Sequence, residues 1–417
     1  MATLRIEGGR TLSGRIAVEG NKNSALPLIA ACVLTDQPCE IANVPRIRDV
    51  DVLLDLIEGI GGRVDGRGSS SLRIECREVR SDRPDPTLVG KLRGSVLLLG
   101  PLLARRGCAR LAQPGGDFPA RRTISVHLEA LFAMGAQALE EPGYALTTPG
   151  LTGASIYLDE ASVTGTETAL LAAAAARGST EIRHAATEPH VVELCEFLQQ
   201  MGVGVEGGGT STIRVHPPAR LSGARHRLHG DYIEAGSWGV VAAITNGDIE
   251  VTGARTQDLE VIAAPLKRMG LQCSHDDDRL LVGPSTLHAA RRITTGLWPG
   301  FPSDMVSLVS VLATQARGRT LVHDWLYELR LFALEQLSAM RADLFLCDPH
   351  RMIVNGPTKL RGRSLDSRDL RSGMALIAAA LAAEGESTVA PLETVERGYG
   401  SLVERLQSLG AQVQRED

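Results

Sequence analysis

One short signature recurs six times along this chain and limits the folds that the sequence can adopt. The signature closes an amphipathic stretch with an apolar residue, then usually a glycine, and then a small or apolar residue. Its copies are Ile60-Gly61-Gly62, Met134-Gly135-Ala136, Met201-Gly202-Val203, Met269-Gly270-Leu271, Met340-Arg341-Ala342 and Leu409-Gly410-Ala411. The step between copies is about 70 residues, and a fixed period of this kind indicates internal repetition. We therefore expect six copies of one supersecondary unit.

The residues between successive signatures predict the same order of elements in each copy. An alanine- or leucine-rich helix, such as 25–34 or 168–177, ends in most copies near a glycine that can cap it in a left-handed conformation. An alternating strand such as 179–183 follows, and then an amphipathic helix such as 191–201. Two short strands complete the copy. Together with a strand before the first helix, they make the unit βαβαββ. Such a unit cannot readily bury both of its faces alone, so neighbouring units must pack together. The periodicity does not decide whether the six units form one solenoid or two closed groups of three.

The composition excludes several classes of partner. The chain has 417 residues and a net charge of −5, so no overall positive field draws it to nucleic acid or to anionic membranes. Aromatic residues make up only 3%, which leaves few platforms for stacked bases. Seven cysteines without a C-x-x-C pair indicate reduced thiols rather than a zinc site. We therefore expect a cytoplasmic protein with no metal, no nucleic-acid partner and no membrane association.

Charged residues beside glycine or other small residues recur, mostly at predicted helix starts. The candidate binding residues of this kind are Lys22 and Asn23, Arg93, Asp117 and Arg122, Asp304, Arg371, and Arg397. Helix amino termini and glycine-rich turns offer free N–H groups to anions, and arginine binds phosphate and carboxylate in a bidentate way. The carboxylates of Asp117 and Asp304 can supply a proton donor and a proton acceptor. Taken singly, each arginine is more simply a surface ion pair, and each aspartate is equally a cap or turn residue.

Together these stretches resemble the enolpyruvyl transferase family, and its UDP-N-acetylglucosamine branch more than its shikimate-pathway branch. The similarity runs from residue 4 to about residue 413. Its motifs, in the family's order, are G-N-K-N-S-A-L-P at 20–27, R-G-S at 93–95, P-G-G-D at 114–117, S-V-T-G-T-E at 162–167, I-E-A-G-S at 233–237, G-F-P-S-D at 300–304, D-L-R at 369–371 and E-R-G-Y at 396–399.

The resemblance implies an α/β fold of two domains, each an inside-out α/β barrel built from three of the six repeats. One domain would span residues 22–229 and carry the lid loop 114–122 and the nucleotide-side contacts. The other, the catalytic domain, would combine residues 1–21 with 230–417. The substrates, phosphoenolpyruvate and a uridine nucleotide, would lie in a cleft between the domains, with no cofactor.

Members of this family move the enolpyruvyl group of phosphoenolpyruvate onto an acceptor hydroxyl and release phosphate. By this resemblance, the donor would be clamped by Lys22, Arg122 and Arg397. Arg93 and Arg371 would add positive charge to the same cleft. The demand for cationic groups follows from the donor, which carries both a phosphate and a carboxylate.

The resemblance also implies which groups move protons and hold the acceptor. Asn23 and Asp304 would hold the acceptor hydroxyl, and Asp304 would take its proton. Asp117 occupies a position where many relatives carry cysteine, and it would protonate the methylene carbon of the donor. Because a carboxylic acid lacks the thiolate that epoxides alkylate, the enzyme would resist fosfomycin. The nucleotide diphosphate would bind to a loop that contains Ser162, Val163 and Thr164.

Several acceptor-side positions depart from the family's usual pattern, which leaves the acceptor open. Tyr232 stands where many relatives have arginine, Glu160 where some have lysine, and Leu329 where a polar residue is usual. The acceptor is UDP-N-acetylglucosamine, for peptidoglycan synthesis, or another uridine nucleotide such as UMP, as in nucleoside-antibiotic pathways; we favour the first. A third hypothesis is a paralogue that binds the ligand without catalysis, although the donor-side residues are complete.

Three further patterns receive structural interpretations. We interpret His127 and His190 as helix or surface histidines rather than catalytic bases. The acidic run 275–278 is expected to be a hairpin turn rather than a metal site, and 348–350 a turn before a strand.

Overall fold

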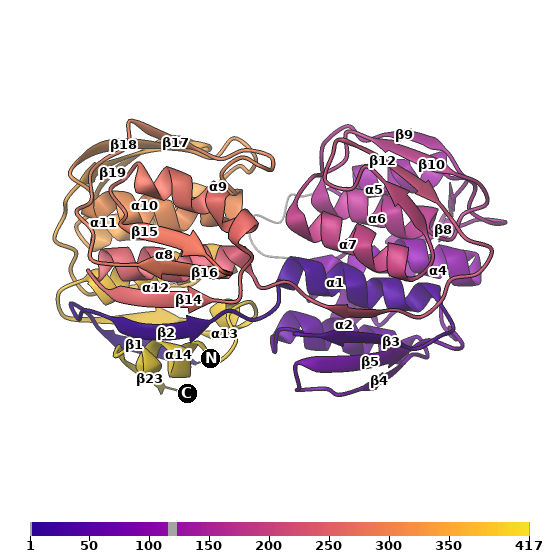
Figure 1. The fold of residues 1–417 in the computed structure, drawn as a ribbon, viewed down its shortest axis with the longest axis horizontal. Helices are drawn as coiled ribbons and strands as arrows, with labels where there is room; N and C mark the ends of the chain where they lie inside the picture. Colours follow the sequence, from indigo (N-terminus) through magenta and orange to yellow (C-terminus); the bar gives the residue numbers. More distant parts are fainter. Residues whose placement is uncertain (1, 116–122, 417) are drawn as a thin grey trace. The chain divides into compact units, whose positions relative to one another are not determined.

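A computed structural model describes residues 2–115 and 123–416 of the chain. The chain divides at 19/20 and 229/230 into two compact units (Figure 1). The first unit comprises the described residues from 20 to 229, and the second comprises residues 2–19 with 230–416. Among the described residues, no helix combines the length and the apolar character that a membrane span requires.

In the described part of the first unit, the strands form three sheets. In spatial order, these are β13 (Arg225–Arg227), β3 (Cys39–Ala42), β5 (Ser71–Glu75) and β4 (Arg63–Asp65); β6 (Cys108–Leu111), β8 (Tyr144–Thr147) and β7 (Gln137–Ala138); and β11 (Gly204–Glu206), β12 (Thr212–His216), β10 (Thr180–Arg183) and β9 (Ser155–Tyr157). The helices are α1 (Lys22–Ala31), α2 (Arg48–Gly59), α3 (Pro86–Val89), α4 (Leu99–Arg106), α5 (Ser125–Ala133), α6 (Val163–Ala173) and α7 (Pro189–Gln200), with 3-10 helices η1 (Cys32–Leu34) and η2 (Arg93–Leu98).

The described part of the second unit also holds three sheets. In spatial order, these are β21 (Ser364–Asp366), β22 (Glu386–Ala390), β1 (Thr3–Glu7) and β23 (Gln412–Glu416); β15 (Cys273–Asp276), β16 (Arg279–Val282), β14 (Asp248–Thr252) and β2 (Ser13–Ala17); and β17 (Arg292–Thr294), β18 (Gly318–His323), β20 (Arg351–Gly356) and β19 (Asp343–Asp348). The helices are α8 (Tyr232–Ile244), α9 (Thr256–Lys267), α10 (Val306–Gln315), α11 (Gln336–Ala339), α12 (Leu370–Ala382), α13 (Glu393–Glu396) and α14 (Leu402–Ser408), with 3-10 helices η3 (Ser303–Met305) and η4 (Arg330–Glu335).

Five of these six sheets share one pairing pattern, in which one parallel pair is followed by two antiparallel pairs. For example, β9 pairs in parallel with β10, which pairs antiparallel with β12, which pairs antiparallel with β11. The sheet of β6, β8 and β7 has only the two antiparallel pairings among the described strands. Where the other sheets have a parallel strand, Arg110 N–H on β6 donates a hydrogen bond to the carbonyl of Asp82.

Apolar helices form the core of each unit. In the second unit, α8, α10 and α12 contact one another, and each is backed by a sheet of its own. Every residue of α8 is buried, because neighbouring helices cover one side and the strands β14 and β16 cover the other. In the first unit, α6 contacts α4, α5, α7 and η2, and the core is again built from alanine, leucine, valine and isoleucine. Burying these side chains is the main favourable contribution to folding.

The recurring signature closes the amphipathic helices with one hydrogen-bond motif. In each copy, the amide of the third signature residue donates to a carbonyl five residues earlier, over 2.9–3.2 Å, which is the Schellman arrangement. The second signature residue has a positive φ, which glycine adopts without steric cost. In the copy that lacks glycine, Arg341 adopts this conformation with φ 74°. The prediction that these positions end helices is therefore confirmed for all six copies.

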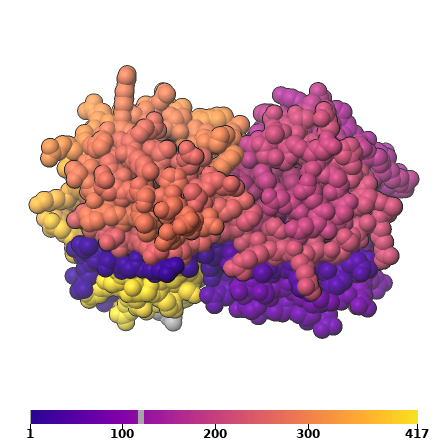
Figure 2. Space-filling view, viewed as in Figure 1, coloured from indigo at the N-terminus to yellow at the C-terminus, as the bar shows by residue number. Residues whose placement is uncertain are grey.

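Strands from both ends of the sequence complete the second unit. β2 pairs in parallel with β14, and β1 lies between β22 and β23. The space-filling view shows the amino-terminal segment beside the carboxyl-terminal residues on the surface of this unit (Figure 2). In the first unit, β13 pairs with β3 shortly before the chain crosses at 229/230. At both crossings the backbone is tight, because a Cβ on Gly20 would lie 1.9 Å from the Asn43 carbonyl oxygen and one on Gly230 would lie 2.0 Å from the Gly253 carbonyl oxygen.

Candidate active site

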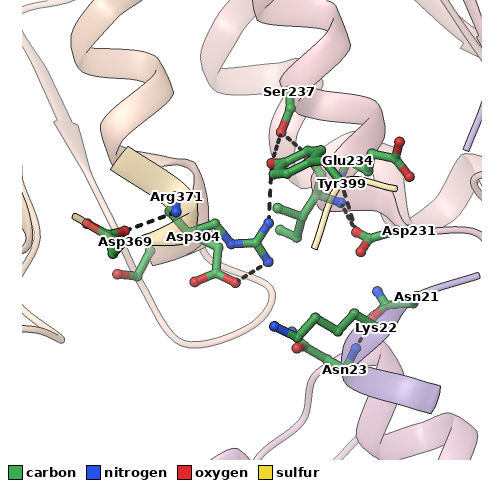
Figure 3. Close-up of polar contacts among 12 residues, drawn as sticks. Asn21, Lys22, Asn23, Asp231, Glu234, Ser237, Asp304, Asp369, Arg371 and Tyr399 are labelled. Atoms are coloured by element: carbon green, nitrogen blue, oxygen red, sulfur yellow. Dashed lines mark hydrogen bonds and ion pairs between the residues drawn. The ribbon is translucent and has the colours of Figure 1, made fainter. Parts of the chain in front are cut away.

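A buried cluster of charges in the second unit centres on Asp304. Its Oδ2 accepts a hydrogen bond from Arg371 at 2.8 Å (Figure 3). Its Oδ1 accepts one from Arg330 at 3.0 Å. The side chains of Arg330 and Arg371 are 11% and 10% exposed, and the aspartate side chain is 27% exposed. Charge-assisted hydrogen bonds of this kind are about twice as strong as neutral ones. The two bonds together therefore hold the Asp304 carboxylate in one orientation.

The start of α12 positions Arg371. Asp369 is the N-cap, and its Oδ1 accepts from the backbone N–H groups of Arg371 and Ser372. The guanidinium of Arg371 also donates to the hydroxyl of Tyr399 at 3.3 Å, and that hydroxyl lies 2.8 Å from the Ser237 hydroxyl (Figure 3). Burial lowers the pKa of Arg371, but Asp304 and Tyr399 raise it more, so its pKa lies above the ordinary value. Arg371 therefore remains a cation inside the protein.

Arg330 is a member of this cluster that the sequence motifs missed. It begins η4, and its NH1 donates to the Ser303 hydroxyl at 2.9 Å as well as to Asp304. Ser303 in turn donates to Asp324 at 2.6 Å, and Asp324 is fully buried at the end of β18. The signal that could have found Arg330 is the one used for Lys22, namely a cation at the start of a short helix.

Two further carboxylates lie at the start of α8, near Arg371. Asp231 is the N-cap, accepting from the N–H groups of Ile233 and Glu234. Burial raises the pKa of Asp231, and Arg371 opposes that rise. Burial also raises the pKa of Glu234 to about 7, although its ion pair with Arg405 opposes the rise. The cluster around Arg371 thus combines buried charges of both signs.

In the first unit, Lys22 and Asn23 form the first turn of α1. The Asn21 side chain caps the helix and accepts from the N–H of Asn23 at 2.8 Å (Figure 3). The Nζ of Lys22 pairs with Oδ2 of Asp49 at 2.6 Å, and the two side chains are 15% and 5% exposed. Asp49, in the first turn of α2, was not predicted from the motifs. This pair places an ammonium group at a helix amino terminus.

Three other predicted residues lie at the start of α6 in the same unit. Ser162 is its N-cap and accepts from the N–H of Gly165, while Val163 and Thr164 begin the helix. The expected loop is therefore a helix start, because the Ser162 side chain satisfies a free N–H group there. The Thr164 hydroxyl lies 2.8 Å from Nε2 of His127 on α5.

Two other predicted residues, Arg93 and Arg397, lie on elements other than α1, α6 and α12. Arg93 begins η2 and donates to the carbonyl of Thr123 at 2.6 Å. Arg397 is half-buried directly after α13, two residues before Tyr399. Asp117 and Arg122 of the lid loop lie outside the described residues.

The interpretation of two histidines as helix or surface residues is confirmed by their positions on helices. His127 and His190 lie on α5 and α7, but they are only 2% and 4% exposed, so neither is a surface residue. Burial, with a smaller contribution from Arg93, lowers the pKa of His127 to about 4. The predicted hairpin turn at 275–278 is confirmed between β15 and β16, and 348–350 joins β19 to β20.

Similarity to known proteins extends over almost the whole chain. The family model of EPSP synthase (3-phosphoshikimate 1-carboxyvinyltransferase) matches residues 6–406. The UDP-N-acetylglucosamine 1-carboxyvinyltransferase of Bradyrhizobium diazoefficiens is 42% identical, over 98% of this chain and 97% of that protein. The protein of the same name from Treponema denticola is 38% identical, over 98% of each. The crystal structure of the enolpyruvyl transferase NikO from Streptomyces tendae has a TM-score of 0.89 and 26% identity, covering 99% of this chain and 98% of that one.

Proposed function

Because this chain belongs to the EPSP synthase family and is therefore an enolpyruvyl transferase, we propose that its acceptor is the 3-hydroxyl of UDP-N-acetylglucosamine. The observation that carries this proposal is the 42% identity, over nearly the full length, to a UDP-N-acetylglucosamine 1-carboxyvinyltransferase. The product would be a precursor of peptidoglycan. On this proposal, the two units are inside-out α/β barrels of three repeats each, with the nucleotide-side contacts in the first unit and the proton acceptor in the second.

The reaction is an addition followed by an elimination. The acceptor oxygen forms a bond to C2 of phosphoenolpyruvate while C3 gains a proton, which gives a tetrahedral intermediate. The C2–O bond to phosphate then breaks, and C3 loses a proton to restore the double bond. Asp117 would donate the proton to C3, and Asp304 would accept the proton of the attacking hydroxyl. Water must be excluded, because it would trap the cationic carbon.

Cationic side chains would bind the donor. Lys22 and Arg397 would meet its phosphate and carboxylate, together with Arg122. To these we add Arg330, because its guanidinium shares Asp304 with Arg371. Arginine binds both kinds of anion with two parallel hydrogen bonds, so a cluster of arginines fits a doubly anionic three-carbon substrate.

Binding of the donor would also change the state of Asp304. Each of its oxygens accepts from a buried guanidinium group, which occupies one of the two lone pairs on that oxygen. A donor phosphate or carboxylate that takes over Arg330 or Arg371 would release one oxygen of Asp304. That oxygen would then accept the hydroxyl proton only when the donor is in place. Asn23 would help hold the hydroxyl, and Ser162, Val163 and Thr164 would bind the diphosphate at the start of α6.

Phosphate release from phosphoenolpyruvate, measured with a panel of acceptors, tests this function. The panel contains UDP-N-acetylglucosamine, other UDP-sugars and UMP, and mass spectrometry of the product identifies the modified acceptor. Release that depends on UDP-N-acetylglucosamine supports the proposal. Release that depends only on UMP would replace it with another uridine nucleotide as acceptor, and ligand binding without any release would identify a non-catalytic paralogue.

A further inference from the structure

A buried carboxylate in the first unit lies outside the site described above and gathers polar groups from the end of that unit. Glu193 projects from α7, and its side chain is 2% exposed. Its Oε1 accepts from Nε2 of His226 at 2.9 Å and from the backbone N–H of His229 at 2.7 Å. The ring Nδ1 of His229 is 3.3 Å from the same oxygen. One carboxylate oxygen therefore fixes the last residues before the crossing at 229/230.

The charge of Glu193 is compatible with this role. Burial alone raises the pKa of a carboxyl, but the hydrogen bonds from His226 and His229 lower the pKa of Glu193 to about 2. The Gln200 amide Nε2 lies 3.1 Å from Nδ1 of His226, and an amide nitrogen donates. The proton of neutral His226 is therefore on Nε2, where it points at Glu193. A buried, ionised carboxylate with this set of donors is expensive to disturb.

A chain of hydrogen bonds leads from Glu193 to the start of α1. The backbone carbonyl of His229 accepts from the N–H of Asn21 at 2.8 Å. The Asn21 side chain then accepts from Asn23 N–H at 2.8 Å and from Ser24 N–H at 3.3 Å, which sets the first turn of the helix. Each link is a short contact between groups that are at most partly exposed. The position of the α1 amino terminus thus depends on a carboxylate one helix away.

We propose that Glu193 is a positioning residue, which sets the place of Lys22 and Asn23 by holding His229 and, through it, Asn21. The inference rests on the proposed function, in which Lys22 binds the donor and Asn23 the acceptor hydroxyl. Glu193, His226 and His229 also present the donor atoms that a divalent metal ion prefers, all within 4.8 Å of one another. We favour positioning because protons already occupy the contacts of Oε1 with His226 and with the His229 backbone.

The test compares three variants of the full chain. Glu193→Ala removes the acceptor, Glu193→Gln keeps an oxygen but removes the charge, and Glu196→Gln is the matched control on α7. Kinetics give kcat and the KM for each substrate, and hydrogen exchange with mass spectrometry follows the amides of residues 20–26. We expect kcat/KM to fall about 10- to 100-fold in Glu193→Ala, the scale of a small misplacement of binding groups. Glu193→Gln should recover part of this loss, since its amide oxygen still accepts from His229.

Hydrogen exchange separates this inference from the proposed function. Faster exchange at the start of α1 in Glu193→Ala, with the control unchanged, supports positioning even if the wild type transfers no enolpyruvyl group. Unchanged exchange there would overturn the inference, whatever the activity. If Glu193→Ala does not fold, Glu193→Gln is compared with the wild type instead. Faster exchange of the α1 amides and a changed KM in Glu193→Gln would then support the inference. One equivalent of metal in the purified protein that is lost in His226→Ala would also overturn it.

Discussion

Substitution of Asp304 by asparagine should lower both the stability of the second unit and the turnover. A second substitution should then restore part of the stability but none of the turnover. The change keeps the side-chain volume but removes the charge that faces Arg330 and Arg371 at 3.0 and 2.8 Å. At such distances, each unit-charge pair is worth about 5 kcal/mol with an effective dielectric constant of about 20, before desolvation is subtracted. Removing one member of a buried pair costs about 3–5 kcal/mol, because the remaining charge stays buried.

The surroundings of Asp304 and its two arginines narrow the expected loss of stability. Asp304 is 27% exposed, which allows water to screen part of the lost attraction. Arg330 retains Ser303 and the ring of Tyr327, 4.6 Å away, while Arg371 retains Tyr399 and the field of Asp231. We therefore expect a loss of about 3 kcal/mol, the lower end of the range for breaking a buried pair. A second substitution, Arg330→Met, removes one of the two unpaired cations and should restore about half of this loss.

Fluorescence offers a local probe of this effect, since Trp238, Trp298 and Trp325 are the three tryptophans of the chain and all lie in the second unit. Urea unfolding followed by tryptophan emission should show Asp304→Asn destabilised and the double variant partly recovered. Turnover should fall about 100-fold or more in both variants, the scale of a lost proton acceptor. Wild-type stability in Asp304→Asn would refute the electrostatic reasoning, and recovery of turnover in the double variant would refute the catalytic role.

Three further outcomes follow from the sequence and the site. Asp117→Ala should reduce turnover about 100-fold or more, the scale of a lost general acid, whereas unchanged steady-state turnover would remove Asp117 from the mechanism. Excess fosfomycin should leave both the activity and the intact mass unchanged, and a stable adduct with lost activity would contradict the carboxylate assignment. His127 has a folded-state pKa of about 4, below its ordinary 6.5, so the first unit should lose about 3 kcal/mol of stability as the pH falls from 6.5 to 4. Circular dichroism of urea unfolding should show a smaller loss in His127→Gln, and equal losses in the two proteins would disprove the assignment.

Local chemistry made the helix ends predictable. An apolar residue followed by glycine and a small residue predicts a Schellman motif, and the structure has that motif at each copy. At the copy without glycine, Arg341 takes the left-handed conformation at a steric cost, and the same two hydrogen bonds form there, from Arg341 N–H to Ser338 and from Ala342 N–H to Leu337. The bounds of the helix expected at 168–177 were wrong, since α6 begins at Val163, directly after its N-cap Ser162, and ends at Ala173.

Long-range contacts explain what the sequence could not predict about the candidate site. Asp304 was predicted from its helix start, but its contacts with Arg330 and Arg371 join residues 26 and 67 positions away. No local pattern encodes such a pairing. Burial is equally non-local: His190 lies on a helix whose sequence permits an exposed face, yet it is 4% exposed because α7 packs against α1 and α6. The roles of the donor-side residues stay predictions.

The place of β1 and β2 in the second unit has a consequence for the order in which the polypeptide could be connected. Thr3 pairs with Glu416, so the two ends of the described chain are neighbours in one sheet. A circular permutant could link these ends with a short flexible joint and open the backbone between His229 and Gly230. Each unit would then be encoded by one uninterrupted stretch, with a single connection at 19/20 in place of two. Truncation of such a permutant at 19/20 would leave either unit with all of its strands. Truncation of the natural chain at 229/230 instead separates β1 and β2 from the sheets to which they belong.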